Sequence, residues 1–225
     1  MKGCDFLSSI KDNIEQVRNT LLDGVTLIAV SKTKSPEEIM EAYDQGIRDF
    51  GENKVQELVS KFEVLPKDIR WHLLGHLQTN KVKKVLGKAY LIQSLDRESL
   101  AVEINKRAEK LSLMVDTLIE VNIGEEKQKT GITLRDLPGF LEIIKNLERI
   151  NVKGLMAIIP QGTNDENTQY FRKMKEVFTD LKKYENERMK MEILSMGMSS
   201  DYEIAMEEGS NMVRVGTKIF GTKNY

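Results

Sequence analysis

The chain has 225 residues, of which 40% are hydrophobic and 31% are charged, and its formal net charge is −1. This balance excludes collagen-like, low-complexity and wholly disordered classes, and it provides no global attraction toward nucleic acid or anionic lipid. The single cysteine, Cys4, excludes an internal disulfide framework and a multi-cysteine zinc site. Because no apolar run is long enough to span a bilayer and the N-terminus does not resemble a signal peptide, we expect a cytoplasmic protein.

Helix-like and strand-like segments alternate along the chain. Apolar residues at helical spacing between Phe6 and Leu21 predict an extra helix at about residues 5–22. Ser35 and Pro36, followed by two glutamates, mark the start of the helix after the first strand. The sequence predicts strands within residues 25–32, 47–51, 71–77, 90–95, 115–123, 152–159, 192–198 and 212–220.

Each predicted strand has a helix beside it, and such repeated units predict parallel strands. The helices that follow the strands are predicted within residues 35–43, 55–62, 79–86, 96–111, 137–147, 171–181 and 201–208. Eight units without a linker favour an α/β fold, a closed (β/α)8 TIM-type barrel that spans residues 1–225 as a single domain. An open doubly wound sheet is the alternative, since periodicity alone does not show closure.

Lys32 is the first candidate functional residue, because functional side chains of parallel α/β folds gather at the carboxyl ends of strands. It follows the apolar run 27–30, and strand alternation places it on the same face as Val30. Desolvation in a barrel mouth lowers the pKa of an amine, and a neutral amine attacks an aldehyde to form a Schiff base. The alternative is a solvated charge at a strand end. By the same alternation, Lys34 is a candidate for transient attachment of an aldehyde.

The loops after the last two strands form a candidate phosphate site. Ser199 and Ser200 precede a predicted helix, whose free N–H groups can hold an anion. Gly216 and Thr217 follow the eighth strand, and the loops after strands seven and eight commonly bind phosphate in barrels. The alternative is ordinary structure, with Ser200 and Glu203 forming a capping box and Gly216 part of a turn.

Arg214 lies two residues before Gly216, so the two share a face of the strand. An inward arginine beside a phosphate loop suits the ring nitrogen of a pyridine cofactor, which it would leave unprotonated. A structural salt bridge is the alternative. The two histidines, His72 and His76, lie on a strand-like stretch without a third ligand at a suitable spacing, so we expect no zinc site.

Several strings of residues together resemble one family. They are AVSKTK (29–34), FGENKVQE (50–57), WHLLGHLQTNK (71–81), VNIGEEKQKTGI (121–132), GLMAI (154–158), SMGMSSD (195–201) and MVRVGTKIFG (212–221). Because these strings occur in order over nearly the whole chain, the sequence closely resembles the pyridoxal 5′-phosphate (PLP) homeostasis proteins, the YggS/PROSC family.

The resemblance implies a barrel similar to the N-terminal domain of alanine racemase, with PLP as its cofactor. It implies that Lys32 carries PLP as a Schiff base and that Arg214 contacts the ring nitrogen. Asn53 is expected to lie near the cofactor, and Met198 near its phosphate. The implied phosphate contacts are Ser199, Ser200, Gly216 and Thr217.

The resemblance favours a regulator or carrier in intracellular PLP homeostasis, without robust catalysis. A PLP-dependent amino-acid racemase is the alternative, but racemisation needs an acid/base group on each face of the substrate Cα. In the racemase fold a second domain supplies one of these groups, a tyrosine, and a chain of this length has no room for that domain. A Schiff-base aldolase is a third hypothesis, which the family strings disfavour. We expect PLP and PLP-dependent acceptor enzymes as partners, no nucleic acid, membrane or metal, and a monomer or weak dimer.

Overall fold

A computed structural model describes residues 9–126 and 128–221 of the chain, and in it eight parallel strands close into a barrel. The strands are β1 (Thr26–Val30), β2 (Asp49–Glu52), β3 (Arg70–Leu73), β4 (Leu91–Leu95), β5 (Val115–Val121), β6 (Ile150–Ala157), β7 (Met189–Met198) and β8 (Met212–Val215). Their order in the barrel follows the chain, and β8 pairs with β1 in the parallel sense. The predicted closed barrel is therefore confirmed, and the open sheet is excluded.

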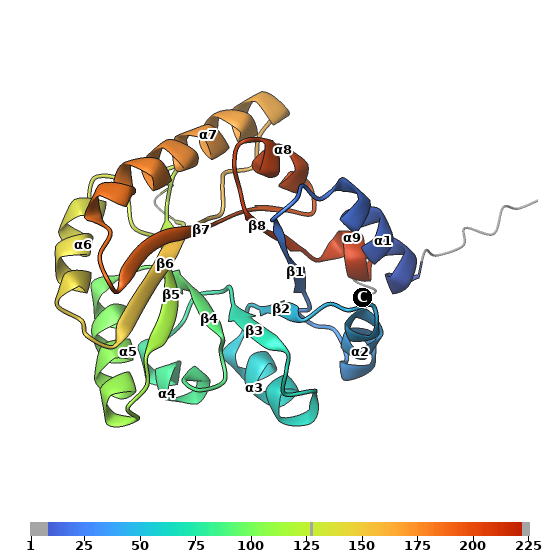
Figure 1. Ribbon diagram of the computed structural model, residues 1–225, viewed down its shortest axis with the longest axis horizontal. Coiled ribbons are helices and arrows are strands. Elements are labelled where there is room, and N and C mark those ends of the chain that lie inside the picture. Colours follow the sequence, from blue (N-terminus) through green and yellow to red (C-terminus); the bar gives the residue numbers. More distant parts are fainter. Residues whose placement is uncertain (1–8, 127, 222–225) are drawn as a thin grey trace, which may run out of the picture.

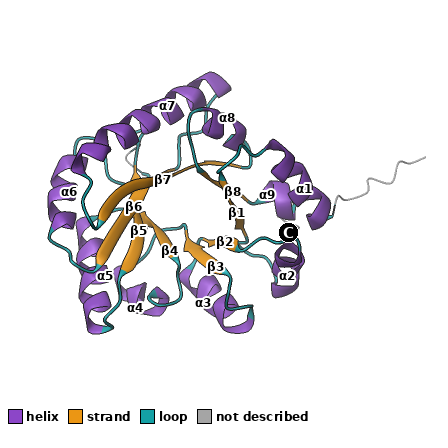
Figure 2. Cartoon of the chain, viewed as in Figure 1, coloured by secondary structure: helices purple, strands orange, loops and turns teal. Residues whose placement is uncertain are grey.

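Helices surround the strands on the outside of the barrel (Figure 1), and Figure 2 shows the same two layers by element type. The helices of the described residues are α1 (Ile10–Thr20), α2 (Pro36–Asp44), α3 (Val55–Val64), α4 (Val82–Val85), α5 (Glu98–Lys110), α6 (Leu137–Lys145), α7 (Asn164–Asp180), α8 (Tyr202–Glu207) and α9 (Thr217–Phe220), with 3-10 turns η1 (Thr79–Lys81) and η2 (Leu181–Tyr184). At the start of α2, Ser35 and Glu38 form the reciprocal bonds of a capping box. Within residues 9–126 and 128–221, no helix has the length and apolarity to cross a membrane.

The last predicted strand is shorter than expected. The segment predicted at 212–220 divides into β8, Gly216 and the short helix α9. The extended backbone ends because Gly216 turns away from it (φ −115°, ψ −73°) and donates its amide to the Ser199 hydroxyl rather than to a neighbouring strand. This break leaves Gly216 and Thr217 in a loop at the barrel mouth.

The extra helix α1 supports this end of the barrel from outside. Ser9 caps it, whereas residues 5–8 of the predicted helix lie outside the described part of the chain. The Asn13 side chain donates to the carbonyl of Ile219 at 2.9 Å, and the hydroxyls of Thr20 and Tyr202 are 2.6 Å apart. Helix α1 is therefore bonded to both α8 and α9, the two short helices beside the mouth.

Two apolar cores hold the barrel together. The larger lies between the strands and the surrounding helices and includes Phe50, Trp71 and Phe171. The smaller is a separate cluster contributed by strands alone and consists of Ile28, Leu91, Leu118, Met156 and Met212. Alternation along β8 explains the division, since Met212 and Arg214 share one face and Val213 and Val215 the other. The interior face of the strands thus carries an apolar layer beneath polar side chains.

Gly154 in β6 and Gly139 in α6 form a matched pair for testing this packing. At Gly154 φ is +146°, and a Cβ atom would lie 1.9 Å from the carbonyl oxygen of Ile193 in β7. Gly154→Ala should therefore lower the free energy of unfolding by about 3 kcal/mol or more. At Gly139 a Cβ would meet nothing within 4 Å, so Gly139→Ala should raise this free energy by about 0.5–1 kcal/mol. Urea denaturation of both variants measures these changes. Equal changes in the free energy of unfolding would contradict the close packing of Gly154 against β7.

Candidate functional site

A cavity of about 450 Å³ opens at the carboxyl ends of the barrel strands. Its lining consists of Val30, Lys32, Asn53, Leu74, Gly75, Ile158, Met198, Ser199, Ser200, Arg214, Gly216, Thr217 and Lys218. All eight residues predicted from the sequence are in this set, although they come from β1, β2, β7 and β8 and the loops that follow. The structure therefore brings the predicted residues together, while the contact that each makes with a ligand stays a prediction.

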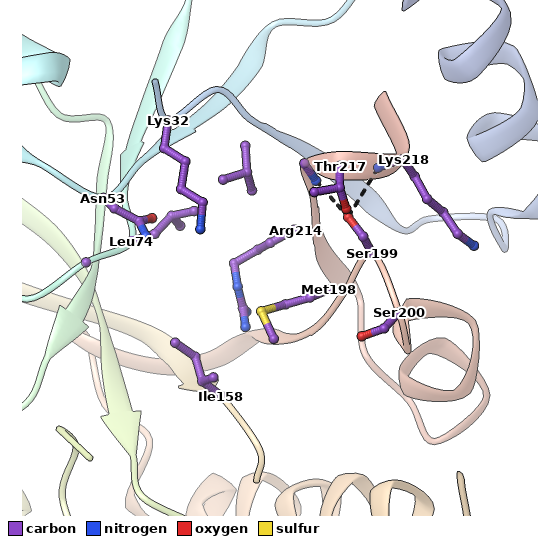
Figure 3. A pocket seen from close by; sticks show the side chains of 13 residues that line it. Lys32, Asn53, Leu74, Ile158, Met198, Ser199, Ser200, Arg214, Thr217 and Lys218 are labelled. Atoms are coloured by element: carbon purple, nitrogen blue, oxygen red, sulfur yellow. Dashed lines mark hydrogen bonds between the residues drawn. The ribbon is translucent and has the colours of Figure 1, made fainter. Parts of the chain in front are cut away.

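Lys32 extends from the loop after β1 into this cavity, and its amine lies on the side where the Arg214 guanidinium is found (Figure 3). Its side chain is exposed. The expectation of a desolvated lysine is therefore wrong, because the cavity opens to solvent. The predicted position at the barrel mouth is correct.

The backbone around Lys32 is held in an unusual conformation. Thr33 has φ +66°, a region that β-branched residues rarely adopt. Its amide donates to Oε2 of Glu57 at 2.6 Å, which offsets the cost of this conformation. Although burial acts in the opposite direction, this bond and the charge of Lys61 lower the pKa of Glu57. The charged carboxylate of Glu57 on α3 therefore fixes the turn at Thr33 that sets the direction of the Lys32 side chain.

A buried ion pair lies directly below this turn. Lys61 Nζ is 2.7 Å from Oε1 of Glu52, and the two side chains are 8% and 0% exposed. Lys61 also donates to the carbonyl of Ser31, and the Ser31 hydroxyl donates to the same oxygen of Glu52 at 2.6 Å. Burial raises the pKa of Glu52, against the opposing effect of Lys61. Sequence reasoning missed Lys61, since a lysine in a helix pattern carries no sign that it turns inward.

Turn geometry also overturns the prediction for Lys34. Its amine donates to Glu38 at 3.0 Å and to the carbonyl of Phe220 at 2.9 Å, and it does not line the cavity. The alternation of faces fails because β1 ends at Val30 and the positive φ of Thr33 redirects the chain. The prediction that Lys34 shares the face of Lys32 was therefore wrong.

On the opposite side of the cavity, the loops after β7 and β8 meet. The Ser199 hydroxyl accepts the amides of Gly216 at 3.0 Å and Lys218 at 3.5 Å, which joins the two loops (Figure 3). The predicted capping box of Ser200 and Glu203 does not form. Helix α8 starts after Asp201, whose carboxylate accepts the Met198 amide, and the Ser200 hydroxyl donates only to Asp201 at 3.3 Å. Ser200 is therefore not occupied as a cap.

Arg214 is the buried cation of the cavity, with 4% of its surface exposed. One end of its guanidinium donates to the Ser195 hydroxyl at 2.7 Å, and the other donates to the carbonyl of Ala157 at 2.8 Å. Burial lowers the pKa of Arg214 to about 10, while Asp201 and Glu120 act in the opposite direction. The group stays charged at neutral pH. Among the described residues no ion pair of Arg214 is found, so the salt-bridge alternative is not supported.

The cavity lining is electrostatically one-sided. Its charged members are Lys32, Arg214 and Lys218, and the part of the chain that the structure describes contributes no carboxylate to the lining. Lys218 was not predicted, although its place directly after Gly216 and Thr217 was a usable signal. The Lys218 amine donates to Glu203 at 3.0 Å and points away from the cavity (Figure 3), so Lys32 and Arg214, with serine and threonine hydroxyls, are the groups that suit a small anionic ligand, and phosphate most of all.

Comparisons with known proteins agree with this geometry. The family of alanine racemase N-terminal domains matches residues 6–224. The chain is 43% identical over 230 residues to the pyridoxal phosphate homeostasis protein of Aquifex aeolicus, with 100% of both chains covered. It is 36% identical to the protein of the same name from Escherichia coli, covering 97% of this chain and 99% of that relative.

Solved structures show the same similarity in three dimensions. PipY of Synechococcus elongatus, in a structure with PLP bound, is 35% identical and has a TM-score of 0.86, with 95% of this chain and 100% of that chain covered. An alanine racemase from Corynebacterium glutamicum is 12% identical with a TM-score of 0.75, over 96% of this chain and 61% of that chain. At this low identity the second comparison supports the barrel fold alone.

Removal of Lys61 tests the support beneath the site. Lys61→Met leaves Glu52 buried without its counterion and should lower the free energy of unfolding by about 3–5 kcal/mol at about pH 8. The deficit should shrink toward about pH 5, because burial raises the pKa of Glu52 and the protonated acid needs no counterion. Urea denaturation at both pH values measures the effect. The double variant Lys61→Met/Glu52→Gln should recover most of the loss, and a single variant as stable as the wild type would contradict the assignment.

Proposed function

The chain belongs to the pyridoxal phosphate homeostasis protein family, and from this membership we propose that it binds PLP in the barrel-mouth cavity. The observation that carries the proposal is the charge of the lining. Among the described residues Lys32 and Arg214 line it without forming a salt bridge, whereas Lys218 is paired with Glu203, so the cavity offers an amine and an anion site together. A volume of about 450 Å³ suits a small cofactor. The PLP-bound structure of PipY supports the same ligand class.

Lys32 is proposed to hold the cofactor covalently. PLP supplies a reactive aldehyde, which the lysine amine would hold as a Schiff base. The turn fixed by Glu57 and the buried Lys61 would keep this amine at one place in the mouth. Asn53 lines the same side of the cavity (Figure 3) and would limit the orientation of the ring.

The loops after β7 and β8 are proposed to hold the phosphate. The hydroxyls of Ser199, Ser200 and Thr217 and the backbone of Gly216 line this side of the cavity. Ser200 is free of a capping role, and Ser199 already joins both loops through the amides of Gly216 and Lys218. Met198 would cover the phosphate end as an apolar wall.

Arg214 is proposed to face the ring nitrogen. A guanidinium donates hydrogen bonds and accepts none, so it would keep that nitrogen unprotonated and weaken the ring as an electron sink. Weak electron withdrawal favours storage of the cofactor over carbanion chemistry. This property supports a carrier or regulator more than a catalyst.

The lining also supports a non-catalytic role. Within the described residues it contains no Asp, Glu, His, Tyr or Cys, and its second amine, that of Lys218, is paired with Glu203 at 3.0 Å. Racemisation requires acid/base groups on both faces of the substrate Cα. We therefore propose that the protein holds PLP in the cytoplasm for PLP-dependent acceptor enzymes, as a monomer or weak dimer, and does not turn over amino acids robustly.

Covalent attachment can be tested by spectroscopy. The purified protein with PLP should show visible absorbance that borohydride bleaches, and mass spectrometry should then locate the reduced adduct on Lys32. Lys32→Ala should lose the absorbance and the adduct because its side chain carries no amine. Lys34→Ala is the matched control and should retain both. An adduct at another lysine in the wild type would overturn the assigned site, and absence of any adduct would overturn the proposed function.

Turnover separates a carrier from a racemase. The PLP-loaded protein should leave each L-amino acid unchanged in chiral chromatography, since the described lining contains no Asp, Glu, His, Tyr or Cys and its second lysine, Lys218, is paired with Glu203. A known alanine racemase, assayed in parallel, shows that the conditions permit racemisation. Robust formation of a D-amino acid that disappears in Lys32→Ala would establish the racemase alternative.

A further inference from the structure

A continuous series of buried hydrogen bonds leads from the cavity into the barrel interior. Arg214 of β8 donates to the Ser195 hydroxyl of β7 at 2.7 Å. That hydroxyl donates to Oε1 of Gln93 in β4 at 2.7 Å. Ser195 and Gln93 are both 0% exposed, so water does not compete for these bonds. The orientation of the Ser195 hydroxyl is thereby tied to that of the Gln93 amide.

The series continues to the opposite end of the barrel. Nε2 of Gln93 is 3.1 Å from Nδ1 of His72 in β3, and Nε2 of His72 is 3.0 Å from Oδ1 of Asp49 in β2. Asp49 also accepts a bond of 2.7 Å from Nε of Arg70, whose side chain is 46% exposed. We call the members Arg214, Ser195, Gln93, His72 and Asp49 the barrel relay.

The charge of Asp49 fixes the direction of every bond in the barrel relay. Although burial acts in the opposite direction, bonds from Arg70 and His72 lower the pKa of Asp49, which is therefore a carboxylate and only accepts. Burial also lowers the pKa of His72, so its ring is neutral and carries one proton. That proton must lie on Nε2, which leaves Nδ1 to accept from Gln93. The Gln93 oxygen then accepts from Ser195, whose lone pairs face Arg214.

We infer that Asp49, His72 and Gln93 are positioning residues for Arg214, acting through Ser195. This inference rests on the proposed function, in which Arg214 faces the ring nitrogen of PLP. If the direction reversed, Gln93 would donate to Ser195, and the hydroxyl oxygen would accept from both Gln93 and Arg214 while its own proton lost the Gln93 acceptor. The hydroxyl would then be a weaker acceptor for Arg214, because a hydroxyl that itself donates a hydrogen bond accepts more strongly, and the guanidinium would be held less firmly.

Asp49→Asn is the variant that tests this inference. Its amide can donate to Nε2 of His72 and so permit the reversed direction with little change in shape. The matched control is Asp68→Asn, which makes the same chemical change just before β3 at a carboxylate that pairs with Arg48 and Tyr43 and is outside the relay.

The first measurement uses the ligand-free protein. Because the chain has two histidines, His76→Gln leaves His72 as the single source of imidazole signals in ¹⁵N NMR. In this background His72 should carry its proton on Nε2, and adding Asp49→Asn should move part or all of it to Nδ1. A proton on Nδ1 without the Asp49 substitution would overturn the inference.

The second measurement uses PLP itself. Asp49→Asn should raise the Kd for PLP about threefold to tenfold, the loss expected for one weakened hydrogen bond to a charged group. It should also shift the pH midpoint of the visible absorbance of bound PLP, a property that a merely looser fold would not move. Asp68→Asn should match the wild type in both. If Asp49→Asn does not fold, Gln93→Leu, which interrupts the relay with a side chain of similar size, should give the same two changes.

The outcomes separate the two claims. A folded relay variant that binds PLP with wild-type affinity and an unshifted midpoint overturns the positioning role and leaves the proposed function intact. A wild-type protein that does not bind PLP overturns the proposed function, and the positioning role for that ligand fails with it.

Discussion

Pairing between the first and last strands is the constraint on which the rest of the site depends. In this pair Ala29 lies opposite Val215, so the segments that leave β1 and β8 emerge side by side. Lys32 and Thr217 are far apart in the sequence but line one cavity as a result. The extra helix α1 reinforces this seam through its bonds to Ile219 and Tyr202. The Lys32 amine and the loops after β7 and β8 are thus neighbours because the barrel closes, and local structure alone would not bring them together.

Carboxylates and cations lie at different depths relative to the barrel-mouth cavity. Carboxylates occupy the layer below the cavity, where Glu52 neutralises Lys61 and Glu57 holds the Thr33 amide. The lining itself carries cations, among them Arg214, which is bonded to neutral oxygens. A ligand with a phosphate group would therefore complete the electrostatics of the mouth, whereas the buried ion pair stabilises the backbone whether or not a ligand is present. The cationic lining can therefore accept an anion, while the Glu52–Lys61 ion pair stabilises the backbone beneath it independently.

The sequence correctly predicted the closed barrel and eight of the residues that line the cavity. The predictions that were wrong have physical causes. Lys32, Arg214 and Gly216 could be found because parallel strands place their carboxyl ends at one mouth and period two relates neighbours on a strand. The same rule misplaced Lys34, since it does not apply beyond the strand end at Val30. The bonds of Ser195 with Gln93 join strands far apart in the chain, and no local pattern encodes which inward side chains will meet. Such contacts depend on the register of several strand pairs at once, and β7 and β8 carry an irregularity in theirs.

The order of the strands has a consequence during protein synthesis. A ribosome makes Lys32 early, whereas Ser199 and Arg214 follow six further strands and Thr217 follows seven. A nascent chain therefore contains Lys32 before the loops on the opposite side of the cavity exist, and a growing polypeptide without β8 lacks the closed barrel that brings them together. The lining of the cavity is therefore complete only after β8 and the loop that follows it have been made and β8 has paired with β1.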